Sequence, residues 1–164
     1  MVVPAAQDPK IARVVQAGKK IGVDVDPVVF SNETRTAADA AREVGCDIGQ
    51  IVKSLVFESE GRPLLFLVSG ANRLDGNRAA RVAGVERVGK ADAAMVKEVT
   101  GFSIGATPPF GHEQSVGVFM DEDLLSYQSV WAAAGRNDAV FEVEPEQLRE
   151  AVGAIVGRLK TEAG

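Results

Sequence analysis

One lysine stands among apolar residues in a short hydrophobic stretch, and its type and position could do chemistry. Residues 50–57 read Gln-Ile-Val-Lys-Ser-Leu-Val-Phe, and Lys53 is the charged residue of this run. An ammonium group among apolar neighbours is costly unless it has a partner, and lysine is rarely fully buried. Lys53 therefore either reaches water from an edge strand or lines a cavity in which it meets an anionic or polar ligand.

A loop rich in glycine and proline is the second unusual feature. Residues 101–112 read Gly-Phe-Ser-Ile-Gly-Ala-Thr-Pro-Pro-Phe-Gly-His, which places Gly105, Pro109 and Gly111 in one segment with His112 directly after it. This composition predicts an ordered loop with unusual backbone dihedral angles, which lets a ligand or another backbone approach closely. A rigid turn without a binding role is the alternative.

Residues for metal or nucleophilic catalysis are scarce. The chain has one cysteine, Cys46, and one histidine, His112, so we expect no internal disulfide, no zinc or iron cluster, and no metal or other cofactor. Cys46 is expected to be a small buried filler, because nothing in its local sequence would lower its pKa.

Length and charge limit the class of protein. The chain has 164 residues, of which 46% are hydrophobic, and we expect one compact soluble domain over residues 1–164. It contains no apolar run long enough for a membrane span, so we expect a cytoplasmic protein with no membrane partner. A net charge of -5 argues against non-specific duplex binding. Basic residues nevertheless gather in residues 73–97, which would suit a phosphate-bearing partner or an ordinary solvated helix face.

Local signals predict the elements that must position these residues. Asp8-Pro9 predicts a helix that ends near residues 18–22, and Thr36 with Asp39 predicts a capped helix that Gly45 stops. Further helices are expected at 75–83, from Asp92 to Gly101, and from Pro145 onward, where the apolar residues Leu148, Val152, Ile155, Val156 and Leu159 have helical spacing. Strands are expected at 23–30, 51–57, 64–68, 85–88, 116–120 and 139–143, the second and third of them as a hairpin.

Four features occur in order along the chain: the Thr-Ala-x-x-Ala-Ala helix that starts at Thr36, residues 50–57, the Ser-Gly-Ala-Asn turn at 69–72, and Gly105-x-x-x-Pro109-x-Gly111. Together they resemble the YbaK/prolyl-tRNA synthetase-associated editing domain. The resemblance covers nearly the whole chain. It implies an α/β fold, with a mixed, largely antiparallel, curved and barrel-like sheet flanked by helices.

The resemblance implies that the chain hydrolyses the ester between a wrong amino acid and the terminal adenosine of a tRNA, commonly the tRNA for proline. Lys53 matches the functional lysine of that family, and the loop with Gly105, Pro109 and Gly111 matches its loop beside the aminoacyl pocket. The pocket is expected between the Lys53 strand, the Thr36 helix and this loop. The further substrate-binding candidates are Thr36, Ser54, Gly70, Asn72 and His112, of which His112 is not universal in the family.

An aminoacyl ester is already activated, so catalysis mainly needs a positioned water and donors aimed at the developing oxyanion. We expect attack by water, with Lys53 holding the terminal phosphate or ribose or polarising the carbonyl. The expected partners are the tRNA acceptor end with its amino acid, and a prolyl-tRNA synthetase or an elongation factor. A non-catalytic nucleic-acid-binding module and a hydrolase of small acyl esters are the alternatives.

Overall fold

The computed structural model describes residues 8–32, 34 and 36–162. Its α-helices are α1 (Pro9–Lys20), α2 (Ala37–Val44), α3 (Gly76–Ala83), α4 (Ala93–Thr100) and α5 (Pro145–Val152), and its 3-10 helices are η2 (Ile48–Gln50) and η3 (Glu122–Ser126). Its strands are β1 (Val28–Val29), β2 (Val52–Ser59), β3 (Arg62–Ser69), β4 (Gly89–Lys90), β5 (Gly117–Asp121), β6 (Val130–Ala133), β7 (Ala139–Val143) and β8 (Ile155–Gly157). No helix of the described residues is long and apolar enough to cross a membrane.

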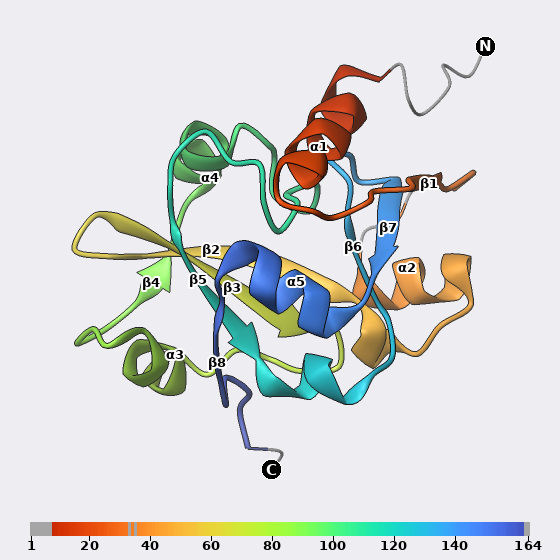
Figure 1. The fold of residues 1–164 in the computed structure, drawn as a ribbon. Coiled ribbons are helices and arrows are strands. Elements are labelled where there is room, and N and C mark those ends of the chain that lie inside the picture. Colours follow the sequence, from red (N-terminus) through yellow and green to blue (C-terminus); the bar gives the residue numbers. More distant parts are fainter. Residues whose placement is uncertain (1–7, 33, 35, 163–164) are drawn as a thin grey trace.

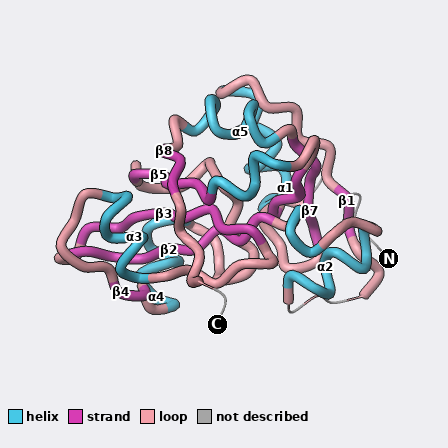
Figure 2. The backbone as a smooth tube through the Cα atoms, turned by 90° about the horizontal axis from the view of Figure 1, so that it is seen from below, coloured by secondary structure: helices cyan, strands magenta, loops and turns pink. Residues whose placement is uncertain are grey.

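The strands form two sheets, which Figure 2 shows side by side. The larger sheet has the order β4-β2-β3-β5-β8, in which β3, β5 and β8 run parallel and the other pairs run antiparallel. The smaller sheet, β1-β7-β6, is antiparallel. Its edge strand β1 comprises only Val28–Val29 of the strand expected at 23–30, and the edge position is the one that Pro27 predicted. The mixed α/β class is therefore confirmed. The two sheets do not close, so the barrel-like part of the prediction is not confirmed.

The β2–β3 hairpin confirms the predicted pairing and carries Lys53. Its register runs from Val52 opposite Ser69 to Ser59 opposite Arg62, which leaves a two-residue turn. Both turn residues have positive φ, 50° at Glu60 and 78° at Gly61. This is the geometry that matches the twist of two antiparallel strands.

The two faces of the larger sheet bury different clusters. Val52 and Val56 of β2 pack in the main core with residues of α1, α4 and α5, whereas Phe66 and Val68 of β3 pack on the opposite side with residues of α3. Figure 1 shows α1 and α4 above this sheet and α3 below it. Side chains of β2 alternate between these environments, so Lys53, which pairs with Val68, and Ser54, which pairs with Leu67, lie on opposite faces.

The C-terminal part of the chain differs from the sequence-based expectation. The predicted terminal helix stops at Val152, because Gly153 adopts a left-handed conformation with φ 64°. The chain then forms β8, which pairs parallel with β5 and leaves Ile155 56% exposed. The apolar residues after Gly153 therefore belong to a strand and not to the predicted continuation of the helix.

Two further strand assignments were wrong. The strand expected at 85–88 is instead the two-residue β4, which pairs with Phe57 and Glu58 of β2. The strand β6 was not predicted at all, and its Trp131 forms an isolated bridge to Ile51. Both are short strands: β4 depends on a partner that is distant in the sequence, β2, whereas β6 pairs with the neighbouring strand β7.

Two glycine substitutions test why α5 stops where it does. Gly153→Ala should lower the free energy of unfolding by about 1–2 kcal/mol, because a Cβ there meets no neighbour but disfavours positive φ. Gly76→Ala, at the first position of α3 and equally open, should be neutral or stabilising by up to about 1 kcal/mol. Urea unfolding of both variants measures the difference, and equal losses would contradict the proposed stop.

Candidate functional site

Lys53 lies half-buried on β2 and donates a hydrogen bond from Nζ to the backbone oxygen of Asn72. Burial lowers the pKa of Lys53 below its ordinary value of 10.5, and the carboxylate of Asp121 partly opposes this shift. The lysine has therefore not snorkelled away to bulk water. It is held against the turn that follows β3.

A buried carboxylate organises that turn. Asp121, at the end of β5, is fully buried and accepts hydrogen bonds on Oδ2 from the backbone N–H of Ser69, at 3.1 Å, and from Nδ2 of Asn72, at 2.8 Å. Its Oδ1 accepts from the backbone N–H of Asp123 at 3.0 Å. A buried charge persists only with such partners. Asp121 thus fixes Asn72, whose carbonyl receives Lys53.

The same network continues to the C-terminal segment. Nδ2 of Asn72 also donates to Asp123 Oδ2 at 2.8 Å, and Lys160 Nζ donates to that oxygen at 2.9 Å. The hydrogen bond from Lys160, followed by that from Asn72, holds the pKa of Asp123 below its ordinary value. Asn72 is therefore the residue that joins Lys53 on one side to Lys160 on the other.

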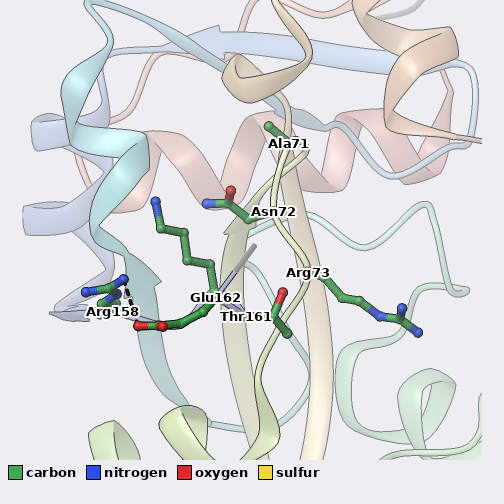
Figure 3. Close-up of a pocket in the computed structure, with 7 residues that line it drawn as sticks. Ala71, Asn72, Arg73, Arg158, Thr161 and Glu162 are labelled. Carbon is green, nitrogen blue, oxygen red and sulfur yellow. Dashed lines mark hydrogen bonds and ion pairs between the residues drawn. The ribbon is translucent and has the colours of Figure 1, made fainter. Parts of the chain in front are cut away.

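A hollow of about 520 Å³ lies beside this network. Figure 3 shows its two walls, formed by the turn after β3 and by the segment after β8, with the Arg158–Glu162 ion pair at one end. The lining residues are Ala71, Asn72, Arg73, Arg158, Lys160, Thr161 and Glu162. The hollow therefore begins where Lys53 is anchored.

The start of α2 packs against the same turn. Thr36 caps α2 with its hydroxyl, which accepts from the backbone N–H of Asp39, and Asp39 accepts in return from the N–H of Thr36. A Cβ placed on Gly70 would lie 2.5 Å from the oxygen of Ile48 and 2.9 Å from the Cβ of Ala37. Glycine at position 70 is thus what allows η2 and α2 to approach this close.

The loop with Gly105, Pro109 and Gly111 lies with α1. Gly105 and Gly111 have φ of 86° and 79°, which confirms the expected unusual dihedrals, and a Cβ on Gly111 would lie 2.7 Å from Ala17 of α1. Pro109 is buried. His112 is half-buried, and its Nε2 lies 2.7 Å from the oxygen of Pro108. Burial lowers the pKa of His112 below 6.5.

The loop and Lys53 contact different faces of the larger sheet. Phe102 and Phe110 of the loop belong to the main core with Val52 and Val56, on the face opposite Lys53. The segment before α2 connects the two groups: Thr34 Oγ1 donates to the oxygen of Asn137 at 2.6 Å, and Asn137 Oδ1 lies 3.2 Å from a Cβ placed on Gly105.

Ser54 presents a buried hydroxyl. Within the described residues its Oγ has no hydrogen-bond partner, although it is shielded from solvent. A buried hydroxyl without a partner is costly, so this oxygen is suited to a water or ligand group. Ser54 lies on the face of the larger sheet that packs against the loop, whereas Lys53 lies on the opposite face of that sheet.

The structure thus gathers the candidates into two groups. Lys53, Gly70 and Asn72 lie at the turn after β3, with Thr36 nearby, and Ser54 and the loop residues lie on the other face. The hollow touches the first group, and neither Thr36 nor the loop lines it. Cys46 is half-buried, not fully buried, and burial raises its pKa, which disfavours the thiolate.

Sequence reasoning missed the residues that anchor Asn72. None of Asp121, Asp123 and Lys160 was among the candidate site residues. One signal was available for Asp121: it directly follows the apolar strand residues Phe119 and Met120, and an acid in a buried strand needs partners.

Comparison with known proteins adds independent information. The family model described as an aminoacyl-tRNA editing domain matches residues 31–151. The uncharacterized protein YwhH of Bacillus subtilis (strain 168) is 29% identical over 125 residues, which cover 76% of this chain and 80% of YwhH. A solved structure described as a candidate trans-editing enzyme for prolyl tRNA synthetase is 44% identical with a TM-score of 0.89, over 94% of this chain and 98% of that chain.

Part of a much longer enzyme is also similar. The proline–tRNA ligase of Thermoanaerobacter sp. (strain X514) is 24% identical over 112 residues, which are 67% of this chain. The match covers 20% of the ligase, so the chain spans about a fifth of the length of this relative.

Removing the charge of Asp121 tests the anchoring network. Asp121→Asn should lower the free energy of unfolding by about 1–3 kcal/mol, because the amide NH₂ replaces one of two accepting oxygens and faces a donor. Glu122→Gln, an exposed neighbour, removes the same charge and should change stability by less than about 0.5 kcal/mol. Urea unfolding compares the two, and a similar loss in both would refute the anchoring role.

The lowered pKa of His112 predicts an acid-sensitive contribution to stability. Below pH 6.5 the unfolded chain binds the proton more readily than the folded chain, so stability should fall as the pH decreases from 6.5 to the lower folded-state value. His112→Gln should flatten this part of the stability profile and leave the profile above pH 6.5 unchanged. Urea unfolding across this range measures it, and an unchanged slope would contradict the burial of the imidazole.

Proposed function

Because the chain belongs to the family of aminoacyl-tRNA editing domains, we propose that it is an aminoacyl-tRNA hydrolase that acts in trans on wrongly charged tRNA for proline. The substrate is then the ester between the amino acid and the terminal ribose. The observation that carries this proposal is the anchored lysine: Lys53 is half-buried, held by the carbonyl of Asn72, and located beside a hollow with basic walls.

The ammonium of Lys53 has donors to spare for a substrate. An ammonium carries three N–H bonds, and within the described part of the chain Asn72 accepts one of them. The remaining donors can bind the terminal phosphate or ribose, or polarise the ester carbonyl. Since partial burial strengthens such interactions, Lys53 needs no covalent bond to the substrate to contribute.

The site proposed for the ester lies at the start of α2. This segment contacts Gly70 through Ala37 and reaches the Gly105 loop through Thr34 and Asn137. A terminal adenosine held near Lys53 and Asn72 could therefore direct its aminoacyl group toward the loop. Gly105 and Gly111 carry no side chain, and their backbone N–H groups are proposed to stabilise the oxyanion.

The reaction proposed is direct attack by water. The water oxygen bonds to the ester carbonyl carbon, the carbonyl oxygen takes the negative charge, and the ribose oxygen leaves as the intermediate collapses. A neighbouring ribose hydroxyl or the substrate amine transfers the proton from water to the leaving oxygen. The half-buried imidazole of His112 donates a hydrogen bond from Nε2 to the backbone oxygen of Pro108 and is proposed to take no part in this step.

A partner protein is proposed to contribute tRNA selection. The chain carries a net charge of -5, so its electrostatic attraction to the whole tRNA is weak. A prolyl-tRNA synthetase or an elongation factor that already holds the tRNA would supply the missing affinity.

The test is deacylation of tRNA for proline charged with Ala, Ser, Thr, Cys or Pro. Wild type should hydrolyse one non-cognate ester, and Lys53→Ala should slow this about 10²–10³-fold, the usual effect of removing a group that stabilises the transition state. Lys90→Ala, which removes an exposed lysine from the adjacent strand β4, is the matched control and should retain activity.

Two results would overturn parts of the proposal. Full activity of Lys53→Ala would remove the lysine from the mechanism. If wild type hydrolyses none of the five esters, with or without the synthetase, the chain is not a deacylase of this tRNA.

A further inference from the structure

The walls of the hollow carry more cations than carboxylates. Arg73, Arg158 and Lys160 line it, and Glu162 is the acid among the lining residues. Glu162 is shared, because Arg78 also pairs with it at 2.8 Å while Arg158 pairs at 3.4 Å. Lys160 pairs with Asp123 at 2.9 Å, whereas two guanidinium groups share Glu162 and Arg73 adds a further positive charge, so cations outnumber carboxylates at the hollow.

The C-terminal segment is fixed to the opposite wall by its backbone. Asp75 N–H donates to the oxygen of Leu159 at 2.7 Å, and Thr161 N–H donates to the oxygen of Arg73 at 2.9 Å. Leu159 is fully buried. The backbones of the two walls are therefore held in register, which fixes the positions from which their basic side chains extend.

We propose that this hollow binds the phosphodiester backbone of the tRNA acceptor end, next to the terminal adenosine held at Lys53. The inference rests on the proposed function in taking tRNA as the substrate. Arg158, Lys160 and Glu162 lie outside residues 31–151, so the family match does not account for this surface.

Position and shape favour a single strand as the ligand. Asn72 places its backbone oxygen on Lys53 and its side chain in the hollow, so a strand that ends at Lys53 continues directly into the hollow. Figure 3 shows Arg73 and Arg158 on opposite sides of the hollow, an arrangement that can contact successive phosphates. Both are exposed, so their contacts with phosphate should depend strongly on salt.

The experiment measures binding of uncharged tRNA at several salt concentrations, so that it does not depend on catalysis. The variant Arg73→Gln/Arg158→Gln leaves Lys160 and the Asn72 network intact. The control Lys19→Gln/Lys20→Gln removes the same charge from two exposed residues at the end of α1. Circular dichroism verifies that both variants fold.

Binding by the Arg73/Arg158 variant should weaken, and the slope of log K against log salt concentration should become less steep by about 1 to 2, whereas the control should match wild type. For charged tRNA, KM should rise while kcat stays within about twofold. Hydrolysis of an aminoacyl ester of adenosine, which has no phosphate, should be unchanged.

Three results would overturn the inference. The first is wild-type affinity and salt slope in the Arg73/Arg158 variant. The second is binding of inorganic phosphate in the hollow, seen by NMR, that tRNA does not displace. The third is loss of binding to prolyl-tRNA synthetase with tRNA binding intact, which would identify a protein as the ligand.

The two proposals can fail separately. If uncharged tRNA binding depends on the hollow but no ester is hydrolysed, the binding site stands and the deacylase function falls. If the adenosine ester is hydrolysed but tRNA binding does not depend on the hollow, the deacylase function stands and the binding site falls.

Discussion

The buried carboxylate of Asp121 is the constraint on which the candidate site depends. It is removed from water, so it must be satisfied by donors, and it obtains them from Ser69, Asn72 and Asp123. These contacts join the end of β5 to the turn after β3. They set the position of the Asn72 carbonyl, and that carbonyl sets the position of Lys53. The lysine is therefore placed by a chain of hydrogen bonds that begins two strands away.

This placement has an electrostatic consequence. Lys53 is partly desolvated, which lowers its pKa, while the nearby charge of Asp121 works in the opposite direction. Lys53 is half-buried and bonds to the carbonyl of Asn72, and within the part of the chain that the structure describes it forms no direct ion pair with Asp121. An ammonium in that condition is a better donor to a substrate oxygen than one that a carboxylate neutralises at contact distance.

The arrangement also separates tasks between the two faces of the larger sheet. The turn after β3 and the basic hollow lie toward the face of α3, whereas the glycine and proline loop packs with α1 on the other face. The start of α2 lies where the two meet. The proposed substrate would place its phosphates at the hollow and its acyl group toward the loop. The net charge of -5 argues against a broad basic surface elsewhere on the chain.

The sequence by itself determined features that depend on neighbours along the chain. Asp8 and Thr36 as helix caps, Gly45 and Gly101 as helix stops, and the β2–β3 hairpin all follow from local chemistry, and each was confirmed. The unusual position of Lys53 could also be recognised from the sequence, because it is a single charged residue in an apolar run. Its role remains a prediction.

Only the tertiary structure determined which residues form hydrogen bonds with Lys53 and Asn72. Lys53 meets a carbonyl 19 residues away, and Asn72 meets a carboxylate 49 residues away. The parallel pairing of β8 with β5 and the contribution of Arg158 and Lys160 to the hollow depend on similar long-range contacts. Local propensity carries no information about which distant strand or carboxylate will be adjacent, because that choice is made by burying the apolar faces together.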